Sequence, residues 1–207
     1  MTIAYRLGNS LYLNITNRCS CDCVFCIRNL TSAVGDASSL WLEREPTVEE
    51  IKNALDVSLR ERDADEIVFC GYGEPMIRAD VVIEICMYIK GIFSSLYGKP
   101  APLVRVNTNG LAFLMHPGFD VSRLELVDTV SISLTADDSA EYQRLSRPKY
   151  GEEAYPALLE FARQAKEYTR VVFSILEGTL TEERVVNCRR IAADMGVALR
   201  IRGMESN

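Results

Sequence analysis

The sequence predicts an α/β protein in which an N-terminal hairpin leads into a parallel sheet of six strands. Two observations predict this fold. Strand and helix signals alternate along nearly the whole chain of 207 residues, which is typical of a parallel sheet with right-handed crossovers. Several predicted strands are also polar on one face only, which indicates a curved sheet with a polar concave side. Six units are two short of a closed eight-stranded barrel.

The elements follow one another in a regular order. Segments IAYRL and LYLNIT flank the turn pair Gly8 and Asn9 and predict the hairpin. Thr47 and Glu50 have the spacing of a capping box, which predicts a helix to about residue 62. The stretch around His116 shows no clear pattern. The remaining segments predict strands at 66–71, 103–110, 130–135, 170–176 and 198–202, and helices at 80–93, 152–168 and 181–196.

Polar residues recur on one face of four predicted strands. Burying such groups without partners costs several kcal/mol each, so together they predict a concave surface that holds water or a polar ligand. For the last strand alone, a solvated sheet edge explains the charges equally well. The residues are Tyr12, Asn14 and Thr16; Arg105, Asn107 and Asn109; Ser131, Ser133 and Thr135; and Arg200 and Arg202.

Composition narrows the class of protein. With 48% hydrophobic residues, residues 1–207 are expected to form one domain. The N-terminus lacks a cationic segment followed by an apolar stretch, and no apolar run approaches the length of a membrane span, so we expect a soluble cytoplasmic protein. A net charge of -6 argues against a broad nucleic-acid surface.

Four of the seven cysteines lie in the segment NRCSCDCVFCIRN, residues 17–29. An odd number of thiols in the cytoplasm favours metal binding or catalysis over a disulfide framework. Cys19, Cys23 and Cys26 form a C-x3-C-x2-C array. Three thiolates can hold three irons of a [4Fe-4S] cluster and leave the fourth iron open for a small molecule. Zinc is the alternative, but the one-residue gaps around Cys21 suit tetrahedral coordination poorly and the single histidine is distant in sequence.

This array, with Phe25 before its last cysteine, resembles the defining motif of the radical S-adenosylmethionine (SAM) enzymes. The resemblance extends over essentially the whole chain. It implies a partial (βα)6 TIM-type barrel, a [4Fe-4S] cluster held by Cys19, Cys23 and Cys26, and SAM bound to the fourth iron. It also implies reductive cleavage of SAM to methionine and a 5'-deoxyadenosyl radical that abstracts hydrogen from a substrate. Cys21 is then a bystander.

The segment GYGEP, residues 71–75, follows the next predicted strand. It resembles the Gly-Gly-Glu-Pro segment that contacts the methionine amino group of SAM in this family, with Tyr72 in place of the first glycine. Gly73 permits close backbone approach, and the Glu74 carboxylate can accept a hydrogen bond from an ammonium group. Taken alone, the motif is also compatible with an ordinary turn.

Three further cofactor contacts follow from the resemblance. Asn109 in NTNG faces SAM or substrate, unless the segment is only a glycine turn. Ser133 binds the ribose hydroxyls, and Arg147 in SRP binds the cofactor carboxylate, unless it is an exposed surface arginine. The other cysteines are predicted to be core residues, so no auxiliary cluster is expected: Cys70, Cys86 and Cys188.

Within the family, the sequence most resembles the short radical SAM proteins associated with TatD-type nucleases. The resemblance leaves the substrate open, whether small molecule or peptide. 7-Carboxy-7-deazaguanine synthases and glycyl-radical activating enzymes are enzymatic alternatives, and an electron-transfer module or a zinc-stabilised interaction domain are the non-enzymatic ones. A flavodoxin or ferredoxin reductant is implied. Arg18 and Arg28 flank the cysteine segment and either dock that acidic partner or are simply solvated.

Overall fold

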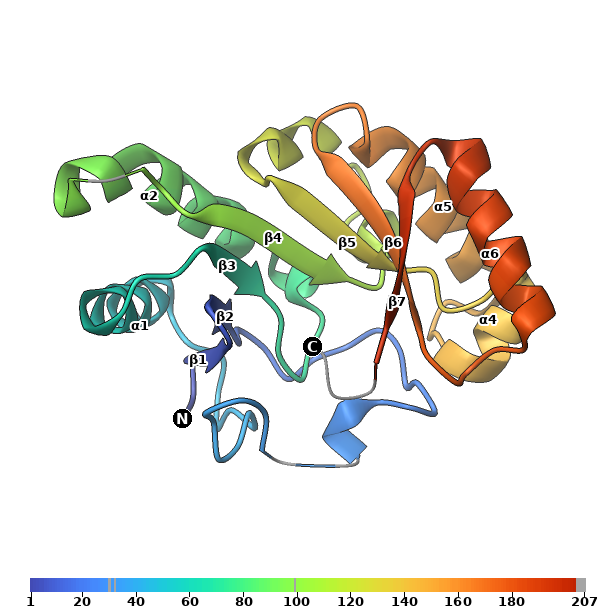
Figure 1. Ribbon diagram of the computed structural model, residues 1–207, viewed down its shortest axis with the longest axis horizontal. Coiled ribbons are helices and arrows are strands. Elements are labelled where there is room, and N and C mark those ends of the chain that lie inside the picture. The colour runs from blue at the N-terminus through green and yellow to red at the C-terminus, as the bar shows by residue number, and fades with distance from the viewer. Residues whose placement is uncertain (30, 32, 99, 204–207) are drawn as a thin grey trace.

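The structure, a computed structural model, describes residues 1–29, 31, 33–98 and 100–203. Its sheet has seven strands in the order β1-β2-β3-β4-β5-β6-β7 (Figure 1). β1 pairs antiparallel with β2, and all later neighbours are parallel. The predicted hairpin and six parallel strands are therefore confirmed, and the sheet is open. The strands are β1 (Ala4–Leu7), β2 (Ser10–Leu13), β3 (Glu66–Phe69), β4 (Leu103–Thr108), β5 (Thr129–Ser133), β6 (Arg170–Leu176) and β7 (Ala198–Arg202).

Helices occupy the connections between the strands, as the alternation predicts. The capping box at the start of α1 is present, because the Thr47 hydroxyl accepts from the Glu50 amide and the Glu50 carboxylate accepts from the Thr47 amide. The α-helices are α1 (Val48–Glu61), α2 (Ala79–Tyr97), α3 (Ala112–Met115), α4 (Ser139–Ser146), α5 (Ala154–Ala165) and α6 (Glu182–Met195). The 3-10 helices are η1 (Ile27–Asn29), η2 (Pro75–Arg78), η3 (Val121–Leu126) and η4 (Gly151–Glu153).

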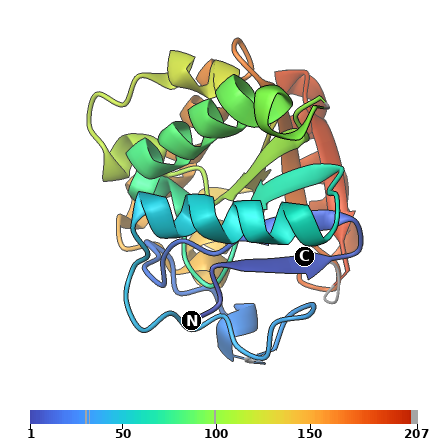
Figure 2. The ribbon, with the colours of Figure 1, turned by 90° about the vertical axis from the view of Figure 1, so that its left-hand side faces the viewer.

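The main hydrophobic core lies between the helices and the outer face of the sheet. On α1 the buried residues Ile51, Leu55 and Leu59 recur every four positions and form one apolar stripe. They belong to the same cluster as Leu11 and Leu13 of β2. α1 and α2 lie side by side on this face (Figure 2). Because the helices cover this outer face of the sheet, the opposite, inner face is left for the functional site.

The inner face near the hairpin is not open, which corrects one prediction. Tyr12 is buried in a second apolar cluster with Tyr5, Val68 and Tyr72, and residues 34–40 cover this cluster. Asn14 is fully buried, and its amide donates to the carbonyl of Leu40 at 2.7 Å. The alternation on the first strand predicts part of a polar ligand surface, but in the structure these side chains hold the covering loop. The loop's position is tertiary information that strand periodicity does not contain.

Several element boundaries also differ from the predictions, and two α-helices, α3 and α4, were not predicted. The strands predicted at 66–71, 103–110 and 130–135 each end at least two residues earlier, because their last residues form turns into the next element. The unpatterned stretch around His116 contains α3 and η3. α4 was not predicted, since its eight residues SAEYQRLS carry too few apolar positions to show a helical period. Its N-cap, Asp138, was the available signal.

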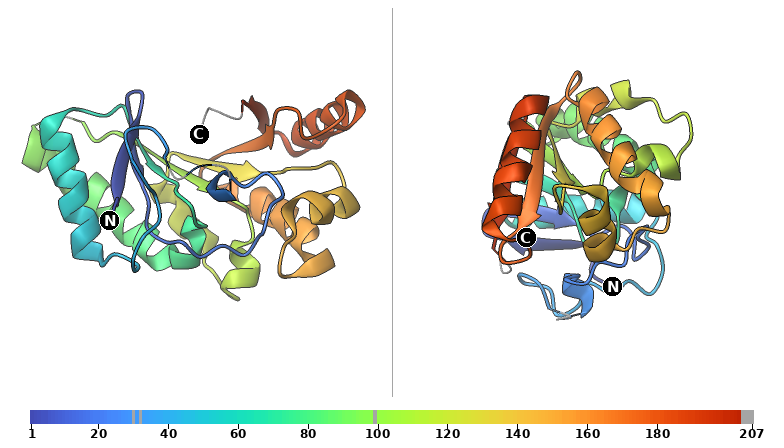
Figure 3. Two further views of the ribbon diagram at one scale, coloured as in Figure 1. Left: turned by 90° about the horizontal axis from the view of Figure 1, so that it is seen from below. Right: turned by 90° about the vertical axis from the view of Figure 1, so that its right-hand side faces the viewer.

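The sheet does not close into a barrel, and β1 and β7 form its two outer edges. The hairpin forms one end, and β7 with α6 forms the other, as two further views show (Figure 3). In the described part of the chain, no helix combines the length and apolar character that crossing a bilayer requires.

Candidate functional site

The cysteine-rich segment leaves β2 at its carboxyl end and rests on the last turn of α4. The Asp22 amide donates to the carbonyl of Ser146 at 3.1 Å, and the Val24 amide donates to the carbonyl of Leu145 at 2.9 Å. Cys21 forms an isolated β-bridge with Pro148, just beyond the helix. The last carbonyls of a helix have no partner within it. Here the cysteine segment supplies partners, so the missed helix α4 is the platform of the site.

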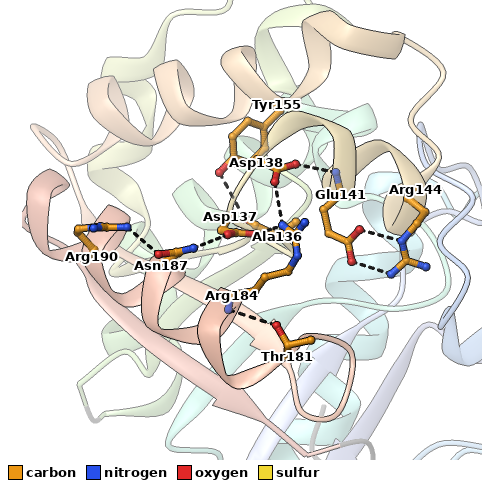
Figure 4. Close-up of polar contacts among 10 residues, drawn as sticks. All are labelled: Ala136, Asp137, Asp138, Glu141, Arg144, Tyr155, Thr181, Arg184, Asn187 and Arg190. Carbon is orange, nitrogen blue, oxygen red and sulfur yellow. Dashed lines mark hydrogen bonds and ion pairs between the residues drawn. The ribbon is translucent and has the colours of Figure 1, made fainter.

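A polar network fixes α4 in turn (Figure 4). The Asp138 carboxylate caps the helix by accepting from the Glu141 amide at 2.8 Å. Arg184 of α6 bonds to both Asp137 and Asp138, and Asn187 donates to Asp137 at 2.8 Å. The network ties the loop after β5 to α6, so the platform is held to the far end of the sheet.

A cavity of about 180 Å³ lies between the cysteine segment and the carboxyl ends of the strands. Every predicted site residue except Arg147 lines it: Cys19, Cys23, Cys26, Tyr72, Gly73, Glu74, Asn109 and Ser133. Parallel α/β folds place their ligands at this end of the sheet. Residues that are up to 114 positions apart in sequence thus meet in one cavity.

The three thiols of the motif share their surroundings with Cys21. A hydrogen bond from the Cys21 thiol is the main cause that lowers the pKa of Cys19 to about 6, and it also lowers the pKa of Cys23. The same contacts raise the pKa of Cys21, whereas burial raises that of Cys26. Cys19 and Cys23 are therefore the thiols most easily converted to thiolate, the form that binds metal.

The donor set fits an iron–sulfur cluster. Soft thiolate ligands favour iron–sulfur clusters or zinc over harder metal ions. Among the described residues, no three His, Cys, Asp or Glu side chains converge on a site for a single ion. The four thiols instead line one wall of a cavity that continues to Glu74. His116, distant in sequence, lines a neighbouring surface cavity with Cys19, and its Nε2 lies 2.8 Å from the carbonyl oxygen of Met76.

The turn at GYGEP packs directly on the cysteine segment. A Cβ atom on Gly73 would lie 2.3 Å from the carbonyl oxygen of Thr16 and 2.6 Å from that of Arg18. The Glu74 amide donates to the Arg18 carbonyl at 2.8 Å. Only glycine permits this approach, so position 73 sets the distance between the turn and the thiols.

Tyr72, which departs from the family pattern, has a structural role. Its ring is buried beneath the covering loop, its hydroxyl donates to the carbonyl of Thr31, and Trp41 contacts its edge at a centroid distance of 5.1 Å. Tyr72 therefore holds both flanks of that loop, at Thr31 and at Trp41, while it also lines the cavity.

Glu74 is buried and extensively hydrogen bonded. Its Oε1 accepts from the Thr108 hydroxyl at 2.7 Å and from the Met76 amide at 2.9 Å, and its Oε2 accepts from the Asn109 amide at 2.7 Å. Burial is the main cause that raises the pKa of Glu74 to about 8, and the charge of Cys19 is the second cause. The three hydrogen bonds lower this pKa and offset part of the rise. In its ionised form the carboxylate offers about four acceptor positions, so one position remains for a ligand, and a cationic ligand there would itself favour the ionised form.

Asn109 connects β4 with the cysteine segment. Its Nδ2 donates to the Ser20 hydroxyl at 2.8 Å and contacts the Cys21 sulfur at 3.6 Å, while its Oδ1 accepts from the Leu111 amide at 3.1 Å. These contacts make Asn109 a positioning residue for the thiols. Ser133, in contrast, lines the cavity without a side-chain hydrogen bond to any residue that the structure describes.

Arg147 lies outside the cavity. It is the C-cap of α4 with φ 45°, a left-handed conformation, and its side chain is 60% exposed. Its guanidinium lies 3.9 Å from the Asp22 carboxylate. The structure therefore does not bring it together with the other predicted residues.

Several residues outside the predicted cofactor contacts also line the cavity. Cys70, predicted as a core residue, packs against the second apolar cluster but is only partly buried and also lines the cavity. A hydrogen bond with the Asn107 side chain partly offsets the rise in its pKa caused by burial. Cys86 and Cys188 are fully buried as predicted. Thr108 lines the cavity as well, and so does Arg202 of the polar face predicted for the last strand. The alternation along β3, with Val68 on the inner face, was the signal that placed Cys70 there.

Comparison with known proteins agrees with this geometry. The family model described as "Radical SAM superfamily" matches residues 13–191. Among curated proteins, "GTP 3',8-cyclase 2" of Mycobacterium bovis and that of Mycobacterium tuberculosis are each 24% identical over 201 residues, which is 95% of this chain and 50% of the relative. The chain therefore spans about half the length of the curated relatives it matches.

Solved structures share the fold. Streptococcus suis SuiB bound to S-adenosylmethionine has a TM-score of 0.69 and 12% identity, covering 98% of this chain and 42% of SuiB. A second structure, anSMEcpe with bound AdoMet, has a TM-score of 0.66 and 14% identity, covering 93% of this chain and 50% of that one. At these identities the likeness is one of fold.

Proposed function

This chain belongs to the radical SAM superfamily of enzymes, whose members bind a [4Fe-4S] cluster and S-adenosylmethionine, and we propose that it generates a 5'-deoxyadenosyl radical to abstract hydrogen from a substrate. The single observation that supports this proposal best is the meeting of three thiols and the buried Glu74 in one cavity at the carboxyl ends of the strands. We also propose that residues 1–207 act as one domain, since one sheet runs through its described part.

We assign the cluster to Cys19, Cys23 and Cys26. When bound, the reduced cluster supplies the electron for cleavage of the SAM sulfonium bond. Asn109 and the backbone contacts to α4 hold the segment that carries these thiols. Cys21 remains a non-ligand in this assignment, because its sulfur is engaged by Asn109 and by the neighbouring thiols.

Glu74 is assigned to the SAM amino group through its remaining acceptor position. Thr108 and the amides of Met76 and Asn109 orient the carboxylate, so it needs little reorganisation on binding. Ser133 is assigned to the ribose, because its hydroxyl faces the cavity free of described partners. Arg147 is assigned to the SAM carboxylate. This assignment requires its exposed side chain to turn into the cavity when SAM binds.

The experiment is anaerobic reconstitution with iron and sulfide, followed by dithionite and SAM. We expect 5'-deoxyadenosine, detected by liquid chromatography with mass spectrometry. An intact [4Fe-4S] spectrum without this product would contradict the proposal. A colourless protein with one zinc per chain would instead support the zinc-stabilised interaction domain.

Glu74→Gln tests the cofactor assignment and separates an enzyme from an electron-transfer module. The glutamine side chain replaces one carboxylate oxygen by an NH₂ group, which is a hydrogen-bond donor. That group then faces the N–H donor of either Asn109 or Met76, and the lost hydrogen bond costs about 1–3 kcal/mol of free energy. We expect SAM to bind roughly tenfold or more weakly in titration calorimetry. The matched control is Glu177→Gln, an exposed carboxylate after β6. Equal affinity in both variants would remove Glu74 from the cofactor site.

The substrate is left open by these arguments. The curated relatives are GTP cyclases by name, and one SuiB structure is described as bound to the precursor peptide SuiA, so the fold accepts a nucleotide in one case and a peptide in the other. We propose a small molecule or peptide as the substrate and flavodoxin or ferredoxin as the reductant. Membership of the TatD-associated subgroup stays a prediction.

A further inference from the structure

Tyr142 of α4 carries a hydroxyl group to which the proposed cofactor chemistry assigns no role. The residue is 1% exposed and lines the cofactor cavity. Its hydroxyl oxygen is shielded from solvent, and no residue that the structure describes forms a hydrogen bond of normal geometry with it. Buried tyrosine hydroxyls usually have a partner, because leaving the hydrogen bond unmade costs free energy. The partner of Tyr142 is therefore to be sought among the groups that cover its hydroxyl.

Two thiols of the cysteine segment lie next to this hydroxyl. Burial is the main cause that raises the pKa of Tyr142, and the neighbouring Cys21 and Cys23 are the next causes. A tyrosine hydroxyl can donate a hydrogen bond, whereas the sulfur of a neutral thiol is only a weak acceptor. Cys21 is a neutral thiol in the proposed assignment. Cys23 becomes a thiolate when it binds iron, and a charged acceptor forms a stronger hydrogen bond.

The same face of α4 holds Cys23 in place. The backbone amides on both sides of Cys23 donate to carbonyl groups in the last turn of this helix. Ser146 follows Tyr142 by four residues, so the two side chains share a face of the helix, and both line the cavity. Hydrogen bonds with Cys21 and, to a smaller extent, with Ser146 lower the pKa of Cys23. α4 thus presents two buried hydroxyl groups to a thiol that is assigned to the cluster.

We propose that the Tyr142 hydroxyl donates a hydrogen bond to the thiolate of Cys23 when the cluster is bound, and that this bond raises the reduction potential of the cluster. The inference deepens the proposed function and rests on it for the presence of the cluster. Hydrogen bonds to the sulfur atoms are one of the features that set the reduction potential of an iron–sulfur cluster. Reduction adds negative charge, so a donor at sulfur stabilises the reduced form more than the oxidised form.

The test is the midpoint potential of the reconstituted protein in the absence of SAM, measured by reductive titration with electron paramagnetic resonance. Tyr142→Phe removes the hydroxyl and keeps the ring. We expect the equilibrium constant for one-electron reduction to fall about tenfold, which makes the midpoint potential more negative by about 59 mV. An unchanged potential would overturn the inference. If SAM binding weakened while the potential stayed the same, the hydroxyl would face SAM instead of Cys23, which also contradicts the inference.

The matched control is Tyr155→Phe, which removes the same group from a neighbouring buried ring. The rings of Tyr155 and Tyr142 are in contact at a centroid distance of 5.5 Å, but the Tyr155 hydroxyl donates to the carbonyl of Ala136 at 3.2 Å (Figure 4). Tyr155 is not among the described residues that line the cofactor cavity. Tyr155→Phe should therefore leave the midpoint potential unchanged. A shift of equal size in both variants would be a general effect of core packing and would contradict the inference.

A double substitution identifies the acceptor. If Cys23 accepts the hydrogen bond, Tyr142→Phe should shift the potential by the same amount in the unchanged protein and in the Cys21→Ala variant. A shift that disappears in the Cys21→Ala variant would make Cys21 the acceptor and overturn the assignment to Cys23.

A second replacement at the same position tests the donor without removing it. 3-Fluorotyrosine at position 142 keeps the ring and the hydroxyl, and its more acidic hydroxyl is a stronger hydrogen-bond donor. We expect a more positive midpoint potential, and no shift or a negative shift would contradict the inference. Iron analysis confirms that each variant carries the cluster. Formation of 5'-deoxyadenosine tests the proposed function separately, since the titration of the potential contains no SAM.

Discussion

Cys21 lies among the motif thiols without sharing their spacing, and at the scale of single residues its contacts decide its role. The Asn109 amide contacts its sulfur at 3.6 Å, and it forms a β-bridge with Pro148. Its hydrogen bonds with Cys19 and Cys23 favour the thiolate of those neighbours. We interpret Cys21 as a residue that shapes the segment and leaves iron binding to the other three.

This interpretation predicts different iron contents for single substitutions. Cys19→Ala, Cys23→Ala and Cys26→Ala should each lose most of the cluster, because two thiolates hold it poorly. Cys21→Ala should keep the iron and the visible absorption of the cluster, although loss of its hydrogen bonds lowers stability by about 1 kcal/mol. Iron analysis and Mössbauer spectroscopy measure the outcome.

Cys188→Ala, a buried cysteine of α6, is the matched control for removing a thiol from the chain. If Cys21→Ala were as depleted in iron as Cys23→Ala, Cys21 would be a ligand. The open iron on which SAM binding depends would then be in doubt.

At the scale of elements, the site depends on α4, whose residues Ser139–Ser146 include none of the predicted ligands. Carbonyl groups in its last turn accept hydrogen bonds from the backbone amides of Asp22 and Val24. Asp138 is the N-cap of its first turn. The hydrogen bond from the Glu141 amide and that from Arg184 lower the pKa of Asp138. The cap is therefore charged at neutral pH and acts at full strength there.

Removing this cap should loosen the cysteine segment. Asp138→Ala is expected to destabilise the protein by about 1 kcal/mol, the usual cost of a lost N-cap, and to speed amide hydrogen exchange at Asp22 and Val24. Hydrogen exchange with mass spectrometry measures both amides. The matched control is Asp120→Ala, which removes the cap of η3. Equal protection in both variants would show that α4 does not hold the segment.

The same substitution has a defined pH dependence. A lowered pKa means that the carboxylate stabilises the fold above its ordinary pKa of 3.8 and loses this effect as the pH falls through the lowered value. The stability difference between the unchanged protein and Asp138→Ala should thus be complete at pH 7 and vanish in strong acid.

At the scale of the whole molecule, charge is distributed unevenly. The net charge is -6, yet arginines gather on the inner face and others flank the cysteine segment. Arg18 forms a bidentate pair with Glu45 at 2.6 and 3.1 Å, and Arg28 is 17% exposed and lies 3.8 Å from Asp22. Both arginines therefore have acidic neighbours, and these reduce their effect on an approaching acidic protein.

The docking hypothesis for the reductant can be tested with these two residues. If Arg18 and Arg28 attract flavodoxin or ferredoxin, Arg18→Gln with Arg28→Gln should slow cluster reduction several-fold at low salt. The effect should shrink above physiological ionic strength, where the Debye length is about 8 Å or less. Stopped-flow absorbance measures the rate. The control is Arg189→Gln with Arg190→Gln on α6. An unchanged reduction rate in the variant with Arg18→Gln and Arg28→Gln would contradict the docking hypothesis.

The sequence by itself determined the order of the elements, the hairpin, the capping box of α1 and the thiol array. Each of these is encoded within a few consecutive residues, where periodicity, turn chemistry and spacing act directly. The candidate residues Cys19, Cys23, Cys26 and Glu74 were predicted for the same reason, since their motifs are local.

Only the tertiary structure decided which side chains share a cavity. The bond between Asn109 and Ser20, the platform formed by α4 and the exposure of Cys70 to the cavity depend on contacts between segments that are far apart in sequence. These contacts depend on how the open sheet curves and on which loop covers its inner face. That curvature results from packing over the whole sheet, and no short stretch of sequence encodes it.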